Sequence, residues 1–222
     1  GIISISNFFA TLLLARNVSP TELGVYGVGF TALRLIRSIQ DGLTIQPINT
    51  YGPAMDENNF RRYATSTALL QLSLALVSAA GAALLGWVLI QTGNDTAGPG
   101  VFSLWPAFLW WQLQEFLRRV LYTRGRVLEA SLNTILANIA RLVWMFFCIQ
   151  NGSITGIAGI QAIAYGSLIA LIPGIWQTRM YITRKPGDIL QDWKHNWDFG
   201  RWVLGSSIAN WVAIEFYPVL TA

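Results

Sequence analysis

The sequence predicts an all-α, polytopic membrane protein, and three observations point to that class. Hydrophobic residues make up 53% of the 222 residues and charged residues only 12%, about half the ~25% of a soluble domain. The mean hydropathy is +0.44. Several apolar runs reach the roughly 20 residues that a membrane-spanning helix needs, and they are too uniformly apolar for the alternating ~10-residue strands of a membrane barrel. The same composition excludes disordered, collagen-like and coiled-coil chains.

Seven segments are predicted to be membrane-spanning helices. The first begins and the last ends inside an apolar run, so we expect a fragment truncated at both ends. The second starts at Ser19-Pro20-Thr21-Glu22, a capping box with Pro at the first helical position. Ser19 is expected to accept a hydrogen bond from the Glu22 backbone N–H, and the Glu22 carboxylate to reach back. The seven predicted spans are about 1–15, 20–43, 62–91, 102–123, 127–149, 154–178 and 201–222.

A more polar stretch, residues 186–202, separates the last two spans. Ile189, Trp193 and Trp197 recur every four residues within it. This spacing favours a short helix lying at the membrane interface, with its tryptophans at the level of the lipid headgroups. An ordinary loop with interfacial tryptophans is the alternative.

The positions of Lys and Arg predict the orientation. Eleven lie near the connections between helices two and three, four and five, and six and seven, whereas the other three connections hold Arg16 alone. Cytoplasmic loops are enriched in Lys and Arg. We therefore expect a multi-pass protein of the cell inner (plasma) membrane, with these three loops and the N-terminus in the cytoplasm. The pI of about 9.5 then reflects topology, and we expect no nucleic-acid partner. The eleven residues are Arg61, Arg62, Arg118, Arg119, Arg124, Arg126, Arg179, Arg184, Lys185, Lys194 and Arg201.

Three arginines, Arg34, Arg37 and Arg141, remain inside the predicted spans. Arg34 lies 14 residues after Pro20, about 21 Å along a helix and therefore well inside a ~30 Å hydrocarbon core. Arg37 lies closer to the cytoplasm, and Arg141 is again near mid-depth. Ionisable residues at such depth usually face a protein interior or a water-filled cavity and serve a function.

Polar residues on the same helix faces predict that these arginines line a cavity. They are Asn7 in helix one, Thr31, Ser38 and Asp41 in helix two, Glu115 in helix four and Asn138 in helix five. Guanidinium groups bind phosphate oxygens in bidentate geometry, so two or three of them suit a pyrophosphate headgroup. Internal ion pairs are the alternative reading: Arg37 with Asp41, Glu115 with Arg118 or Arg119, and Arg141 with Glu115.

Residues 15–27, Ala-Arg-Asn-Val-Ser-Pro-Thr-Glu-Leu-Gly-Val-Tyr-Gly, resemble the signature that joins the first two helices of Wzx-like polysaccharide-biosynthesis flippases. These belong to the multidrug/oligosaccharidyl-lipid/polysaccharide exporter superfamily. The family pattern is roughly A-R-x-L-S-P-x-E-[FL]-G-x-Y, and Val18 replaces the usual Leu. Residues 199–207, Phe-Gly-Arg-Trp-Val-Leu-Gly-Ser-Ser, also look like the opening of the family's helix seven.

The resemblance implies a fold and a function. It implies two six-helix lobes around a central cationic cavity, with residues 1–180 as the N-lobe, 181–200 as a cytoplasmic linker and 201–222 as the start of the C-lobe. Such flippases translocate undecaprenyl-pyrophosphate-linked oligosaccharide across the inner membrane by alternating access, for O-antigen or exopolysaccharide synthesis. The implied partners are that lipid-linked substrate and the bilayer, with a glycan polymerase and the chain-length machinery as further candidates.

Three other functions remain open at this stage. A cation-coupled multidrug exporter of the same superfamily would have acidic residues and few arginines in its cavity. A membrane-embedded glycan polymerase or acyltransferase would need a catalytic group, and His195 and Cys148 stand apart from any partner in sequence. A membrane scaffold without transport activity would not need charged stripes at mid-depth. Metal-ligand spacings are absent, so we expect neither an enzyme, nor a cofactor, nor a bound metal.

Overall fold

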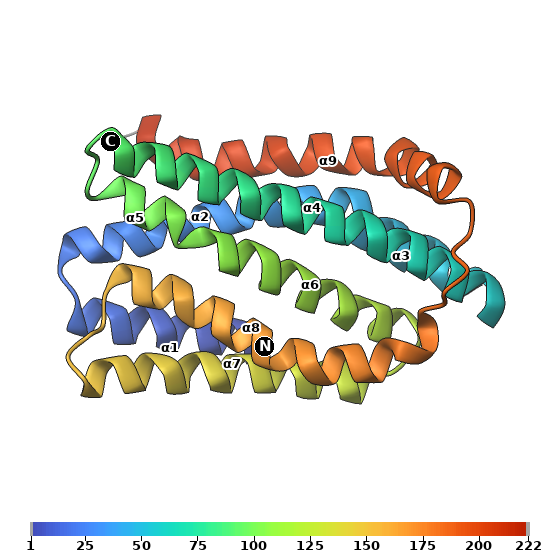
Figure 1. Ribbon diagram of the computed structural model, residues 1–222, viewed down its shortest axis with the longest axis horizontal. Coiled ribbons are helices and arrows are strands. Elements are labelled where there is room, and N and C mark those ends of the chain that lie inside the picture. The colour runs from blue at the N-terminus through green and yellow to red at the C-terminus, as the bar shows by residue number, and fades with distance from the viewer. Residues whose placement is uncertain (1, 221–222) are drawn as a thin grey trace.

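The computed structural model describes the backbone of residues 2–220 and the side chains of residues 4–213. Within that part all the regular secondary structure is helical, and the helices run side by side as a bundle (Figure 1). The α-helices are α1 (Ile2–Asn17), α2 (Pro20–Gln40), α3 (Gln46–Tyr51), α4 (Glu57–Gln91), α5 (Ala97–Phe102), α6 (Leu104–Thr123), α7 (Val127–Gln150), α8 (Gly156–Thr178) and α9 (Ile189–Leu220). The all-α prediction is confirmed for these residues.

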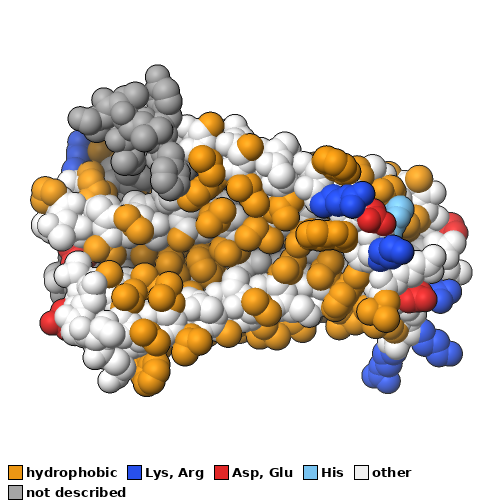
Figure 2. Space-filling view, turned by 90° about the horizontal axis from the view of Figure 1, so that it is seen from above, with side chains coloured by type: hydrophobic (Ala, Val, Ile, Leu, Met, Phe, Trp, Pro, Cys, Tyr) orange, Lys and Arg blue, Asp and Glu red, His pale blue; other side chains and the backbone are white. Residues whose placement is uncertain are grey.

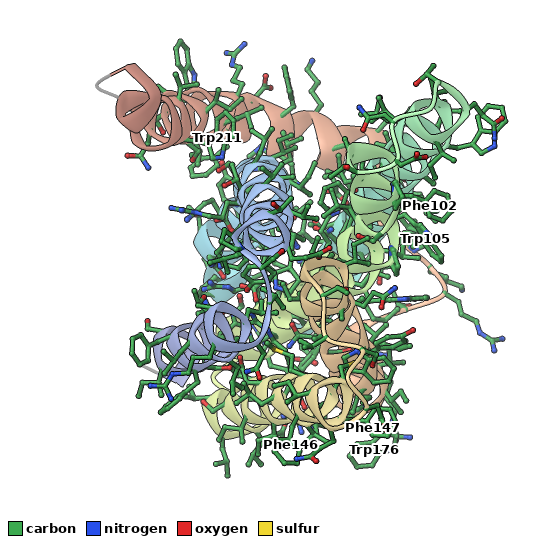
Figure 3. All side chains as sticks on the ribbon, turned by 90° about the vertical axis from the view of Figure 1, so that its left-hand side faces the viewer. Phe102, Trp105, Phe146, Phe147, Trp176 and Trp211 are labelled. Carbon is green, nitrogen blue, oxygen red and sulfur yellow. The ribbon has the colours of Figure 1, made fainter. Side chains whose placement is uncertain are left out.

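Three helical segments, Glu57–Gln91, Val127–Gln150 and Gly156–Tyr181, are long and apolar enough to cross a membrane. Large apolar side chains on these segments point outward: Val77 is 72% exposed and Leu128 is 72% exposed. The labelled Phe146, Phe147 and Trp176 lie at the periphery of the bundle (Figure 3). An apolar surface with polar groups inside suits lipid and not water. The membrane prediction is therefore supported, whereas the other predicted spans and the six-helix lobe stay predictions.

The connections between helices alternate between the two ends of the bundle. The α1–α2, α4–α5 and α7–α8 turns share one end, and the α3–α4, α6–α7 and α8–α9 connections share the other (Figure 1). Figure 2 shows most of the Lys and Arg side chains on one face gathered at this second end, with hydrophobic side chains over the middle. The predicted grouping of basic connections is thus present in the structure. The side of the membrane that each end faces stays a prediction.

The helical backbone that begins with α2 continues past residue 43, the expected end of its span. A π-helical turn, η1 (Asp41–Ile45), joins it to α3, so the backbone stays helical to Tyr51. Gly42 in η1 packs against Gly200 of α9, where an added Cβ would collide with the Gly42 carbonyl oxygen. Because neither residue has a side chain, the two backbones approach closely and α9 lies directly on this turn.

A helix begins where the interfacial helix was expected, but it does not end where the linker was predicted to end. Its place at the membrane interface stays a prediction. Helix α9 is continuous from Ile189, so no break separates the 181–200 linker from the 201–222 segment. The indole N–H of Trp193 donates to the Ser66 carbonyl (2.8 Å), and the Tyr63 hydroxyl donates to the Asn196 side chain (2.5 Å). These bonds hold the first turns of α9 against α4, while Trp197, one turn further along, is 50% exposed.

Glu22 connects two helices at the end opposite the basic connections. Ser19 accepts from the Glu22 N–H (3.3 Å), as the capping box predicts. The Glu22 carboxylate does not reach back, however, and instead accepts from the backbone N–H of Gly156 (2.6 Å). The first N–H groups of α8 lack partners within their own helix, so this carboxylate satisfies one of them. The bond links the N-termini of α2 and α8.

Candidate anion-binding cavity

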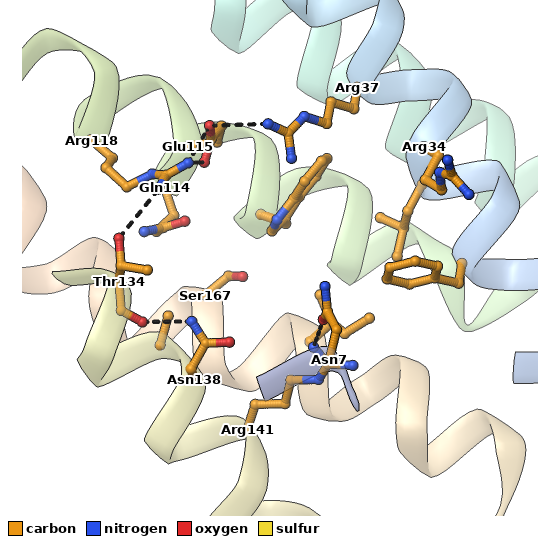
Figure 4. A pocket seen from close by; sticks show the side chains of 15 residues that line it. Asn7, Arg34, Arg37, Gln114, Glu115, Arg118, Thr134, Asn138, Arg141 and Ser167 are labelled. Carbon is orange, nitrogen blue, oxygen red and sulfur yellow. Dashed lines mark hydrogen bonds and ion pairs between the residues drawn. The ribbon is translucent and has the colours of Figure 1, made fainter. Parts of the chain in front are cut away.

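A cavity of about 120 Å³ lies inside the bundle, enclosed by α1, α2, α6, α7 and α8 (Figure 4). We call it the arginine cavity. Its lining residues are Asn7, Phe30, Leu33, Arg34, Arg37, Trp111, Gln114, Glu115, Arg118, Thr134, Ala137, Asn138, Arg141, Ile163 and Ser167. A water molecule occupies ~30 Å³ in the liquid. The cavity therefore has room for several waters or for a compact polar group.

A second cavity, of about 510 Å³, lies between α1, α2 and α9, and we call it the α9 cavity. It shares Asn7, Phe30, Arg34 and Arg37 with the arginine cavity, so the two adjoin along α1 and α2. Its other lining residues are Ser38, Asp41, Ser207, Asn210 and Trp211. Figure 3 shows Trp211 on the side of α9 that faces α2. The α9 segment thus contributes hydroxyl, amide and indole groups to the wall of this larger space.

The structure brings most of the sequence-predicted site residues together. Arg34, Arg37, Arg141, Asn7, Glu115 and Asn138 all line the arginine cavity. Ser38 and Asp41 line the α9 cavity instead. Thr31 lies on α2 and is not among the lining residues of either cavity.

On the α6 side, the arginines have a carboxylate partner. Glu115 is only 3% exposed, and its carboxylate forms an ion pair with Arg118 (Figure 4). The Arg119 Nε donates to it at 3.0 Å, and the Arg37 Nη2 lies 3.9 Å from it. Arg37 also reaches Asp41, with its Nε 3.4 Å from the carboxylate. The internal ion pairs expected for Glu115 and Arg37 are therefore present.

On the opposite side, Arg141 has neutral partners. Its Nη1 donates to the Asn7 side-chain oxygen (2.6 Å) and its Nη2 to the Tyr26 hydroxyl (2.6 Å). The side chain is buried, at 6% exposure, and its Nε has no hydrogen-bond partner. The alternative pairing of Arg141 with Glu115 is absent among the described side chains. Arg141 therefore keeps a positive charge that no described carboxylate neutralises.

Sequence reasoning placed one cavity residue wrongly. Arg118 was counted with the basic loop that follows α6, but it is 6% exposed and lines the arginine cavity. Its Nη1 donates to the Thr134 hydroxyl (3.3 Å). The three-residue spacing from Glu115 places the two side chains on one helix face, and it predicted their ion pair but not the place of Arg118 in the cavity. Tyr26 was also missed, because its hydroxyl meets Arg141 only through the packing of α2 on α7.

The charges around the arginine cavity suit an anion. Four arginines and one carboxylate line it, and charge-assisted hydrogen bonds from guanidinium groups are strong and geometrically suited to phosphate oxygens. Among the residues that the structure describes, no three His, Cys, Asp or Glu side chains come close enough to hold a metal ion. His195 stacks on Tyr51, with ring centroids 4.2 Å apart, and does not line this cavity.

No protein-family model, no curated protein and no solved structure matches this chain. The resemblance of residues 15–27 to a flippase signature therefore stays a prediction. The functional argument depends on the cavity and on the side chains around it.

Proposed function

We propose that the protein carrying this chain is a flippase, a membrane transporter that moves undecaprenyl-pyrophosphate-linked oligosaccharide from the cytoplasmic to the outer leaflet. The observation that carries the proposal is the arginine cavity: four arginines and one carboxylate face a small space inside a bundle with an apolar surface. An arginine at mid-membrane costs at least about 2.5–3.5 kcal/mol on insertion scales, so such residues are usually retained for function.

The two adjoining cavities match the two parts of such a substrate. The pyrophosphate would bind the guanidinium groups of the arginine cavity, and the first sugars would lie in the larger α9 cavity. Ser207 and Asn210 offer hydrogen bonds there. Arg34 and Arg37 border both spaces and would contact the headgroup at the junction.

The proposed architecture follows from the same assignment. Residues 1–180 form a six-helix N-lobe, and the part of α9 after residue 200 begins a C-lobe that encloses the cavity from the other side. The basic end of the bundle faces the cytoplasm, in agreement with the enrichment of Lys and Arg in cytoplasmic loops. Binding sites between two lobes near the midplane are common in transporters that work by alternating access.

A cation-coupled exporter is the weaker candidate. It would need carboxylates available to bind a cation. Glu115 and Asp41 both form ion pairs with arginine, which opposes that use.

The test is export of surface glycan by cells that depend on the full-length protein. We expect Arg34→Ala combined with Arg141→Ala to abolish export while the protein still inserts at the normal level, because the headgroup loses two of its guanidinium partners. Arg16→Ala is the matched control, since Arg16 lies at the end of α1 and lines neither cavity. Normal export by the double variant would exclude the anion site.

A further inference from the structure

We propose that Asn7 and Tyr26 are positioning residues that form a neutral cradle for Arg141, and that their lack of charge makes Arg141 available to an anionic headgroup. The inference rests on the proposed function and adds a role for two residues that do not themselves carry the charge. It ranks Arg141, on the α7 side, above Arg37 and Arg118 as a phosphate-binding group.

The cradle fixes the guanidinium at two of its donors. Asn7 of α1 accepts from Nη1 and Tyr26 of α2 accepts from Nη2, both at 2.6 Å. A guanidinium has five N–H donors, so three remain without a partner among the described side chains. One of these is the buried Nε. Buried donors without partners are unfavourable. Arg141 lines the arginine cavity, so an anion or water there would bond the remaining Nη donors, while the buried Nε stays without a partner.

The packing around Tyr26 holds its hydroxyl in place. The Tyr26 side chain is 5% exposed and stacks on Phe30, with ring centroids 6.0 Å apart. Gly159 of α8 lies beneath the ring, where an added Cβ would approach Tyr26 Cδ2 to 2.9 Å. The missing side chain at Gly159 therefore leaves the space that the ring occupies. Tyr26 has little freedom to turn away from Arg141.

The neutrality of the cradle distinguishes it from the contacts of Arg37 and Arg118 in the cavity. Glu115 neutralises Arg118 and attracts Arg37, so a phosphate must compete with a carboxylate for those groups. At Arg141 it competes only with an amide oxygen and a hydroxyl. Hydrogen bonds to neutral acceptors leave the net charge of the guanidinium unchanged, and its attraction for an anion is then strong in a low-dielectric site.

Asn7→Asp is the first test, because it changes the charge of the cradle while keeping the size of the side chain. The new carboxylate would stand within hydrogen-bond distance of Nη1 and neutralise Arg141. We expect the affinity of the full-length protein for inorganic pyrophosphate, measured in lipid nanodiscs, to fall at least tenfold. The unfolding temperature should stay the same or rise, since the hydrogen bond gains charge assistance. Because Asn7 also lines both cavities, the new carboxylate would repel pyrophosphate directly as well, so the loss must be clearly smaller in the Arg141→Ala background. An equal loss of affinity in that background would contradict the cradle.

Tyr26→Phe provides a second, independent test. Removing the hydroxyl frees Nη2 and loosens the guanidinium, and we expect pyrophosphate affinity to fall roughly three- to tenfold. Tyr63→Phe is the matched control: its buried hydroxyl also makes a side-chain hydrogen bond, to Asn196, but Tyr63 does not line the cavity. This control should lower stability without changing affinity. In the Arg141→Ala background, Tyr26→Phe should have no further effect on affinity, because both act through the same guanidinium.

The outcomes separate the two proposals. If the unmodified protein does not bind pyrophosphate, or binds it equally well after Arg34→Ala with Arg141→Ala, the proposed function fails. If it binds through these arginines but Asn7→Asp binds as tightly as the unmodified protein, the cradle is wrong. If Asn7→Asp does not insert into the membrane, Tyr26→Phe decides the question alone. A loss of pyrophosphate affinity on Tyr26→Phe that persists in the Arg141→Ala background would overturn the cradle.

Discussion

The two sides of the arginine cavity hold arginines in opposite electrostatic conditions. On the α6 side, Arg118 and Arg119 share the buried carboxylate of Glu115, and Arg37 lies 3.9 Å from it. On the α7 side, Arg141 contacts only an amide and a hydroxyl. Burial is nearly the same, since Arg118 and Arg141 are each 6% exposed. The difference is the charge of the partner.

This contrast shows that burial alone does not identify a binding arginine. A buried arginine with a carboxylate partner forms an internal ion pair. Removing one partner of such a pair strongly destabilises the fold, because the other charge stays buried without a counter-ion. A buried arginine with neutral partners keeps its charge and can attract a ligand. The α6 side would therefore contribute mostly to stability and the α7 side mostly to binding.

The largest expected effect would come from breaking the ion pairs on the α6 side. Glu115→Ala leaves the buried Arg118 and the partly exposed Arg119 without their counter-ion, and we expect a loss of about 3–5 kcal/mol in the free energy of unfolding. Arg141→Met should cost less, about 1–3 kcal/mol, because it leaves only the neutral acceptors of Asn7 and Tyr26 unpaired. Unfolding of the purified full-length protein measures both. An equal loss in the two variants would contradict the contrast between the sides.

A smaller effect is expected from the packing behind Arg141. Gly166 of α8 faces α7, where an added Cβ would collide with the Ala137 carbonyl oxygen and approach the Arg141 backbone N to 3.2 Å. We expect Gly166→Ala to destabilise the protein by about 1–3 kcal/mol, as overpacking does, and to weaken pyrophosphate binding by moving Arg141. Gly81→Ala is the control, since nothing lies within 4 Å of a Cβ there. If both substitutions behaved alike, close α7–α8 contact would not position Arg141.

The smallest expected effect on stability comes from Asp56, a carboxylate that is exposed to water, whereas Glu115 is buried. Asp56 caps α4, accepting from the backbone N–H groups of Asn59 and Asn58 at 3.0 Å. The bond from the Asn59 N–H, the largest cause, holds the pKa of this carboxyl below its ordinary value of 3.8. Its stabilising contribution is therefore present above that value and is lost as the pH falls through the lower pKa of the folded state.

Asp56→Ala tests this dependence. The difference in unfolding temperature between the unmodified protein and Asp56→Ala should be constant near neutral pH and shrink in strong acid. Asp56→Asn, which keeps a capping oxygen, should lie between them at neutral pH. A difference that grows in acid would mean that Asp56 does not act as a charged cap.

Much of the fold was predictable because membrane helices have strong local signals. Uniform apolar runs indicate where the helices lie in the sequence, and Ser19-Pro20 indicates the residue at which α2 begins. Which helices pack against one another was harder to predict from the sequence. The continuity of α9 through the linker depends on its contacts with Ser66 and Tyr63 of α4, which no local pattern reveals.

The candidate site was predictable in its charges and less so in its partners. Depth along the helices identified Arg34, Arg37 and Arg141, and helical spacing identified the Arg37–Asp41 pair. The Tyr26 hydroxyl and the Glu22 carboxylate look like parts of a local motif, yet they act across 115 and 134 residues of sequence. Such contacts depend on how α2 packs against α7 and α8, so spacing within one helix could not predict them.

The Arg141 cradle also has a consequence for how the protein is made. Asn7 and Tyr26 precede Arg141 by 134 and 115 residues, so α1 and α2 leave the ribosome well before α7. When the nascent α7 enters the bilayer with a charged side chain in its middle, both acceptors for that side chain are already there. The order of synthesis thus makes two hydrogen-bond acceptors available to Arg141 when α7 inserts. Without them, insertion of this charged residue would be most unfavourable.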